Sequence, residues 1–224
     1  MKGNGYMGKY ELVVFDVDGT LLDTTEGVVE SVKFAINQYG LKMPSNEELK
    51  KFIGPPIQDS LANQYKGISD DLIKALTKAF RDNYKDVNLL KAEPYDGIYE
   101  LCEKIIASGI KIAAATYKRH DYAVRLLKHF GFDKYSNILY GADDNNKLKK
   151  RDIIELAIKD SGITDYSQVV MVGDSSHDAL GAEQIGVDFI GVTYGFEFET
   201  IEDVNGFRNV GAAVKPEDIF KFIV

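Results

Sequence analysis

The sequence has few of the side chains that form covalent cross-links. It contains one cysteine, Cys102, among 224 residues. A single cysteine cannot form an internal disulfide, and its place in an apolar helical pattern predicts a buried packing residue. Because the composition offers no disulfide framework, it is typical of proteins of the reducing cytoplasm, and we expect a cytoplasmic location.

Long apolar runs and an excess of positive charge are also missing. No stretch approaches the roughly 20 apolar residues that a membrane-spanning helix needs. The first ten residues hold two lysines, three glycines and no apolar segment, so we expect no signal peptide, no anchor and no membrane partner. The formal charge is −8, which argues against nucleic acid as a partner, because its phosphates are bound mainly by clustered Lys and Arg. Small anions remain suitable substrates, since a metal and a few local cations can outweigh the net charge.

The pattern of hydrophobic residues predicts an α/β protein. With 45% hydrophobic residues, the chain can bury a full core. Short apolar runs, rich in β-branched residues, alternate with helical patterns of ten or more residues. We expect strands at 11–15, 110–115, 137–140, 168–172, 188–192 and 212–214, and a last short helix at 216–224. The alternation predicts a doubly wound parallel sheet with a Rossmann-like core and helices on both faces.

One segment interrupts this alternation. Residues 23–94 show helical periodicity, for example at Val28, Val32 and Ala35, without a convincing strand. We therefore predict an α/β core formed by residues 1–22 and 95–224, with a small all-helical cap domain at 23–94. A turn interrupts the middle of the insertion at Gly54-Pro55-Pro56.

Two acids follow the first predicted strand directly, in the string Asp16-Val17-Asp18-Gly19-Thr20. Ligands of open parallel sheets bind at the carboxyl ends of the strands, where Asp16 and Asp18 fall. Gly19 favours a turn that lets both carboxylates face one site. An isolated Asp-x-Asp is equally well explained as a solvated acidic loop, but the complete string after a buried strand is far more specific.

A second acidic motif, Gly173-Asp174-Ser175-Ser176-His177-Asp178, follows the predicted strand 168–172 and precedes a helix near Ala179. Four converging carboxylates repel one another unless a divalent cation lies among them, and oxygen ligands suit Mg²⁺ rather than zinc. Asp178 has a second interpretation as the N-cap of the helix, which does not exclude catalysis. His177 is interpreted as a loop residue or an outer neighbour of the site and not as a ligand.

Two further motifs suit phosphate binding. Thr116-Tyr117-Lys118 follows the predicted strand 110–115, where a hydroxyl and backbone N–H groups entering a helix can hold phosphate oxygens. Taken alone, the threonine is better explained as a helix cap, and only the other motifs favour phosphate binding. A basic cluster precedes the predicted helix 152–160, and one of its lysines would neutralise the phosphate and the nucleophile. Sequence order alone does not choose among Lys147, Lys149, Lys150 and Arg151.

With these four motifs, nearly the whole chain resembles the haloacid dehalogenase superfamily, specifically the phosphoglycolate phosphatase-like branch whose helical cap follows the first motif. The resemblance implies that Asp16 is the nucleophile and Asp18 the general acid/base. It favours Lys150 as the site lysine, because Lys150-Arg-Asp-Ile-Ile matches the branch's Lys-x-x-Ile/Val-Ile pattern better than Lys149 does. The implied binding residues are Thr116, Tyr117 and Lys150 for phosphate, Asp16, Asp18, Asp174 and Asp178 for Mg²⁺, and Gly54, Pro55 and Pro56 for the substrate-facing loop of the cap.

The resemblance implies a Mg²⁺-dependent phosphatase that hydrolyses a small phosphorylated metabolite through an aspartyl-phosphate intermediate. Asp18 favours ester hydrolysis, because dehalogenases lack this second aspartate and phosphonate-cleaving members replace it with a small residue. Its expected work is to protonate the leaving alcohol and then to activate water. Phosphoglycolate, a 5′-nucleotide and pyrophosphate all stay open as substrates. The oligomeric state is also open, and residues 1–6 are either disordered or upstream of an alternative start at Met7.

Two other functions use related sites. A phosphosugar mutase resembling β-phosphoglucomutase shares the core and the cap type, but the cap lacks an obvious arginine near Gly54 for a second phosphate. A phosphorylatable signalling receiver also combines acids, Mg²⁺, Thr and Lys. Receivers are shorter, have no helical insertion and carry the phosphorylated aspartate on a middle strand, whereas Asp16 ends the first strand.

Overall fold

The computed structural model describes residues 9–144 and 147–224. Within these residues, six strands form one sheet in the order β5-β4-β1-β6-β7-β8, and every neighbouring pair is parallel. The strands are β1 (Leu12–Phe15), β4 (Lys111–Arg119), β5 (Leu139–Ala142), β6 (Val169–Gly173), β7 (Asp188–Val192) and β8 (Gly211–Ala213). The expectation for residues 1–6 lies outside the described residues.

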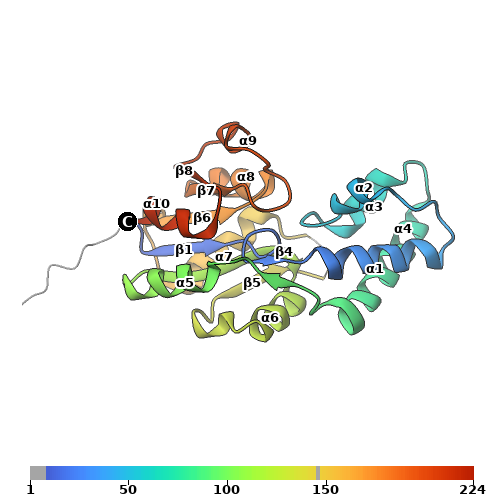
Figure 1. Cartoon of the computed structure of the whole chain (residues 1–224), viewed down its shortest axis with the longest axis horizontal. Helices are drawn as coiled ribbons and strands as arrows, with labels where there is room; N and C mark the ends of the chain where they lie inside the picture. The colour runs from blue at the N-terminus through green and yellow to red at the C-terminus, as the bar shows by residue number, and fades with distance from the viewer. Residues whose placement is uncertain (1–8, 145–146) are drawn as a thin grey trace, which may run out of the picture.

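Helices cover both faces of this sheet (Figure 1). Because side chains alternate along a strand, Val13 and Phe15 of β1 join the hydrophobic cluster on one face, while Leu12 and Val14 join the cluster on the other. The core helices are α5 (Ile98–Ala107), α6 (His120–His129), α7 (Lys150–Ser161), α8 (Ser176–Ile185), α9 (Ile201–Asn205) and α10 (Phe220–Ile223), with short 3₁₀ turns at Phe132–Lys134, Tyr166–Gln168 and Pro216–Ile219. The prediction of a doubly wound parallel sheet is confirmed.

The segment between the first strand and the rest of the core is helical and lies beyond one end of the sheet (Figure 1). Its helices are α1 (Thr25–Gln38), α2 (Asn46–Lys50), α3 (Ile57–Gln64), α4 (Asp70–Asn83) and the π-helix η1 (Tyr84–Asn88). A two-residue antiparallel pair, β2 (Leu22–Asp23) with β3 (Glu93–Pro94), joins the two connections to the core. It lies at the predicted boundaries of the cap, although the division into two domains stays a prediction.

Two of the differences from the expected element boundaries bear on the site. Strand β4 continues to Arg119 through an irregularity in its pairing with β5, so residues 116–118 belong to a strand and α6 begins only at His120. Helix α8 begins at Ser176 instead of near Ala179, because Ser175 is its N-cap and Asp178 completes a capping box. The interpretation of Asp178 as the N-cap is therefore wrong. Ser175 is the N-cap, and the side chain of Asp178, in the first turn of the helix, accepts the backbone N–H of Ser175.

The register of the strand pairing explains why the two acidic motifs lie close together. Phe15 pairs with Val172 on one side and with Ala114 on the other, so the residues that follow all three strands emerge at the same edge. The Asp16 N–H donates to the Val172 carbonyl at 2.9 Å, which fixes the chain at this point. In the described part of the chain, no helix is both long and apolar enough to cross a membrane.

Candidate active site

Three buried carboxylates meet at the carboxyl edge of the sheet. Asp16 follows β1, Asp174 follows β6 and Asp178 lies in the first turn of α8. One oxygen of each lies within 4.8 Å of the others, and the residues are 5%, 3% and 0% exposed, respectively. Burial raises the pKa of Asp16 to about 7, and the neighbouring charges of Asp178 and Asp18 act in the same direction. Burial, with Asp178 and Asp16, also raises the pKa of Asp174 well above its ordinary range.

This cluster has the donor set of a site for a hard divalent cation. All of its donors are oxygens, as Mg²⁺ prefers. Asp178 Oδ1 is buried, and its charged neighbour is the Lys150 ammonium; because a carboxylate oxygen has two lone pairs, it can also bind a cation. A bound cation would also offset the repulsion that raises the two carboxyl pKa values.

Lys150 supplies the positive charge of the cluster. Its Nζ lies 2.5 Å from Asp16 Oδ1 and 2.6 Å from Asp178 Oδ1. Although burial lowers the pKa of Lys150, the two carboxylates raise it above its ordinary value, so the side chain stays protonated at neutral pH. Of the basic residues 147–151, Lys150 is the buried one that reaches Asp16, whereas Lys147 and Lys149 are exposed. The structure thus brings together Asp16, Asp174, Asp178 and Lys150.

Asp18 lies beside the cluster and has its own partners. Thr24 Oγ1 donates to Asp18 Oδ1 at 2.5 Å, and Lys118 Nζ lies 2.9 Å from the same oxygen. Sequence reasoning missed both contacts. The signal for Lys118 was its place in the Thr116-Tyr117-Lys118 motif, but only a strand that continues through residue 118 places its side chain beside Asp18.

The other two residues of that motif also lie in β4, near its carboxyl end. Thr116 is 1% exposed, and its hydroxyl accepts the N–H of Lys118 at 3.1 Å. The hydroxyl of Tyr117 accepts the backbone N–H of Lys150 at 3.0 Å, so Tyr117 supports the first residue of α7. His177, which was interpreted as an outer neighbour, packs edge-on against the Tyr117 ring at 5.2 Å. That Thr116 and Tyr117 bind phosphate stays a prediction.

Two small cavities adjoin these residues. The first, of about 20 Å³, is lined by Asp16 and Asp174 of the cluster and by Gly54 and Pro55 of the cap, so the predicted substrate loop lies over Asp16. The second, of about 70 Å³, lies on the Asp18 side, and its cap lining includes Pro56. Its remaining lining combines aromatic with cationic side chains, among them Phe52, Phe80, Tyr84 and Tyr122 with Arg81, Lys118 and Arg119.

A core loop after β7 completes the wall of the site. The Phe196 N–H donates to Asp174 Oδ2 at 2.6 Å, and the Tyr194 hydroxyl donates to the Thr20 carbonyl at 3.0 Å. A Cβ at Gly195 would collide with Asp174 and with the carbonyl oxygen of Gly19. This turn therefore borders the site through Phe196 and packs against the loop after β1 through Tyr194.

A doubly wound sheet with acids at its carboxyl edge and a helical insertion after the first strand defines the class of the protein. Residues 13–192 match the family model of the haloacid dehalogenase-like hydrolases, so the chain belongs to this family.

Similar proteins include phosphatases and a nucleotidase with different named substrates, and also proteins named tyrosine-protein kinase, such as PtkA from Mycobacterium tuberculosis at 32% identity. A 5′-nucleotidase from Pseudomonas aeruginosa is 33% identical over 192 residues, which cover 85% of this chain and 86% of that protein. A phosphoglycolate phosphatase from Agrobacterium fabrum is 31% identical over 191 residues, with coverage of 83% and 81%. The crystal structure of a predicted phosphatase from Clostridium acetobutylicum superimposes with a TM-score of 0.86 at 29% identity, covering 95% and 97% of the two chains. The protein is therefore a phosphatase of this family.

Proposed function

We propose that this protein is a Mg²⁺-dependent phosphatase that hydrolyses a small phosphomonoester through an aspartyl-phosphate on Asp16. The observation that carries the proposal is the shared cluster of Asp16, Lys150, Asp174 and Asp178, with Asp18 beside it. The proposal gives these residues the roles of a nucleophile, a fixed positive charge and a carboxylate set for a cation, all around one point.

The chemistry divides into two displacements on phosphorus. First, an Asp16 oxygen forms a bond to phosphorus while the bond to the leaving oxygen breaks, and Asp18 gives that oxygen a proton. Then Asp18 takes a proton from a water molecule whose oxygen attacks the same phosphorus, which releases inorganic phosphate and restores the Asp16 carboxylate. Lys150 reduces the repulsion between Asp16 and the anionic phosphoryl group.

The carboxylates of Asp16, Asp174 and Asp178 would hold the Mg²⁺, and Asp18 stays a predicted member of the same set. When bound, the ion supplies positive charge that stabilises the transferring phosphoryl oxygens. Burial of the three side chains strengthens this effect, because water screens charges less inside a protein.

The cavity on the Asp18 side supports a small leaving group. Its volume of about 70 Å³ corresponds to roughly two to three water molecules at about 30 Å³ each, which suits a leaving group of a few heavy atoms such as that of phosphoglycolate. Arg81 and Arg119 in its wall suit an anionic leaving group. A 5′-nucleotidase is the second candidate, favoured by the aromatic rings in the same wall, on which a base could stack after the cavity widens.

The first test replaces the nucleophile. Asp16→Asn preserves the size of the side chain but removes the attacking charge, so we expect turnover of p-nitrophenyl phosphate with Mg²⁺ to fall by at least about 1000-fold. The matched control is Asp96→Asn, in an exposed turn, which should keep wild-type activity. An Asp16→Asn variant that folds and retains turnover would exclude Asp16 as the nucleophile.

The second test identifies the leaving group. Phosphate release is measured with Mg²⁺ over phosphoglycolate, 5′-nucleotides, pyrophosphate and sugar phosphates, and we expect small anionic esters to give the highest kcat/KM. Preference for nucleotides would support the second candidate. Conversion of a glucose phosphate into its isomer without phosphate release would instead establish a mutase and refute the proposed function.

A further inference from the structure

Lys118 carries a buried positive charge that the two displacements described above do not use. Its side chain is 7% exposed and lies at the carboxyl end of β4, against the π-helix η1. Burying an ammonium group is costly unless partners surround it. The groups that contact the Lys118 ammonium therefore indicate the function of this residue.

Two groups hold the Lys118 ammonium. Its Nζ lies 2.9 Å from Asp18 Oδ1 and donates to the Tyr84 hydroxyl at 2.8 Å. Burial lowers the pKa of Lys118, but Asp18 and Tyr84 raise it above its ordinary value, so the charge persists at neutral pH. The site thus contains two lysine–aspartate pairs, Lys150 with Asp16 and Lys118 with Asp18.

The contacts fix the direction of the Asp18 carboxylate. Lys118 and the Thr24 hydroxyl both approach Oδ1, so Oδ2 receives neither of these two donors. Two donors on one oxygen restrict rotation of the carboxylate about its terminal bond. A general acid must hold its proton within hydrogen-bond reach of the leaving oxygen, so this restriction bears directly on its efficiency.

Tyr84 is itself held at the junction between the helical insertion and the core. Its ring stacks on Phe80 with centroids 5.4 Å apart and meets the edge of Tyr122 at 5.9 Å. Two hydrogen bonds tie the neighbouring backbone to α6, from the Tyr122 hydroxyl to the Arg81 carbonyl and from Arg125 to the Lys85 carbonyl. Tyr84 is therefore a fixed point against which Lys118 is placed.

We propose that Lys118 is a positioning residue that directs the acid/base carboxylate of Asp18, and that Tyr84 holds Lys118 in place for this task. The inference rests on the proposed phosphatase function. The competing role for Lys118 is direct contact with the leaving group, because its side chain also lines the 70 Å³ cavity. The two roles predict different results when Lys118 is replaced. If Lys118 positions the general acid, the loss of kcat/KM depends on whether the leaving group needs a proton.

The experiment compares two esters of similar size, p-nitrophenyl phosphate and benzyl phosphate. Nitrophenolate leaves without a proton, whereas the benzyl alkoxide needs one, so only the benzyl ester depends strongly on a general acid. For Lys118→Met we expect kcat/KM to fall about 30- to 100-fold with benzyl phosphate and less than about 5-fold with p-nitrophenyl phosphate. Tyr84→Phe, which keeps the ring and Lys118, should reduce the benzyl value about 2- to 10-fold. Lys118→Arg should recover part of the loss.

A double-mutant cycle tests whether Lys118 acts through Asp18. With p-nitrophenyl and benzyl phosphate, adding Lys118→Met to Asp18→Asn should cause no further loss, because there is no acid left to position. A further loss of 10-fold or more would overturn the proposal. Equal losses with both esters in the single variant, or no loss with either, would overturn it as well.

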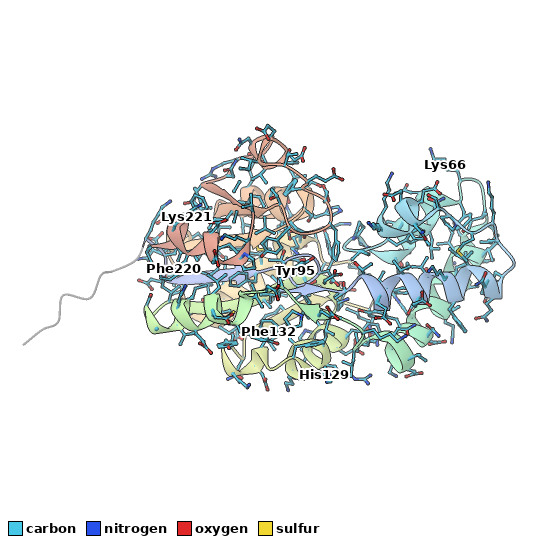
Figure 2. All side chains as sticks on the ribbon, viewed as in Figure 1. Lys66, Tyr95, His129, Phe132, Phe220 and Lys221 are labelled. Carbon is cyan, nitrogen blue, oxygen red and sulfur yellow. The ribbon has the colours of Figure 1, made fainter. Side chains whose placement is uncertain are left out.

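Controls separate this inference from its premise. Lys66→Met removes an exposed lysine on the outside of the cap (Figure 2) and should match the wild type with both esters. Thermal unfolding checks each variant, and if Lys118→Met does not fold, the ester ratio of Tyr84→Phe decides the question. A wild-type protein that hydrolyses neither ester would refute the phosphatase function itself, whereas normal wild-type turnover with the wrong ratio refutes only the role of Lys118.

Discussion

Replacing Asp174 by asparagine should stabilise the metal-free protein and abolish its response to Mg²⁺. Among the described residues, Lys150 forms ion pairs with Asp16 and Asp178, but no ion pair reaches Asp174. Its carboxyl is buried, and the pKa is raised well above the ordinary value by burial and by its two acidic neighbours. Asparagine removes the charge and can still accept the Phe196 N–H that Asp174 accepts at 2.6 Å.

The size of the effect follows from the unpaired buried carboxyl, and its pH dependence follows from the raised pKa. A buried polar group without a partner typically costs about 1–3 kcal/mol, so we expect a gain of this order at neutral pH, or roughly 2–12 °C in Tm for a chain of this length. A folded-state pKa above the unfolded value means that the contribution of Asp174 to stability falls as pH rises from about 4 through the folded-state pKa. The advantage of the variant should therefore vanish in acid and grow toward neutral pH.

Thermal unfolding with EDTA and with excess Mg²⁺ measures both effects. At 100 times its Kd, a ligand that binds only the folded state adds about 2.7 kcal/mol, which we expect for the wild type and not for Asp174→Asn. Asp96→Asn, with its exposed side chain, should behave as the wild type in both buffers. The reasoning fails if the Asp174→Asn variant is less stable than the wild type in EDTA at neutral pH, or if Mg²⁺ stabilises it as much.

Two further predictions concern parts of the fold that support the site. Gly195→Ala should destabilise the protein by about 1–3 kcal/mol and lower Mg²⁺ affinity, because a Cβ there collides with Asp174 and the Gly19 carbonyl; chemical unfolding and a Mg²⁺ titration test this, and an unchanged midpoint would contradict it. Burial raises the pKa of Tyr10 to about 12, so its contribution to stability is complete below pH 10 and decreases as pH rises from about 10 to 12. Tyr10→Phe should make unfolding midpoints less dependent on pH over that interval, and an equally steep decline in the variant would count against it.

The placement of the acids could be predicted because it depends on short-range patterns. An apolar run followed by Asp16 or by Gly173-Asp174 predicts the end of a buried strand, and parallel strands bring such ends to one edge. The choice of Lys150 among the neighbouring basic residues needed the resemblance to a family. The adjacent Lys149 is the same residue type, and only the structure shows that Lys149 is exposed and Lys150 is buried.

The partners of Asp18 could not be predicted, because they depend on the path of the backbone. Whether Lys118 reaches Asp18 depends on an irregularity after Thr116 that prolongs β4, and no propensity marks it. Tyr84 comes from a π-helical turn in a different part of the chain, and Tyr117 uses its hydroxyl on α7. The β2–β3 pair was missed for another reason, since two-residue strands are too short to show alternation.

The strand order has a consequence for the synthesis of the protein. Strand β1 is flanked by β4 and β6, so its four buried apolar residues find their second neighbour only after residue 173 has left the ribosome. At the usual 5–20 residues per second, this delay lasts on the order of 10–30 s. Contacts between residues so far apart in the sequence slow folding. They also leave an apolar segment exposed to chaperones and to aggregation until the second neighbour has been synthesised. The arrangement that gathers the acids from distant parts of the chain also makes the active centre one of the last features to form.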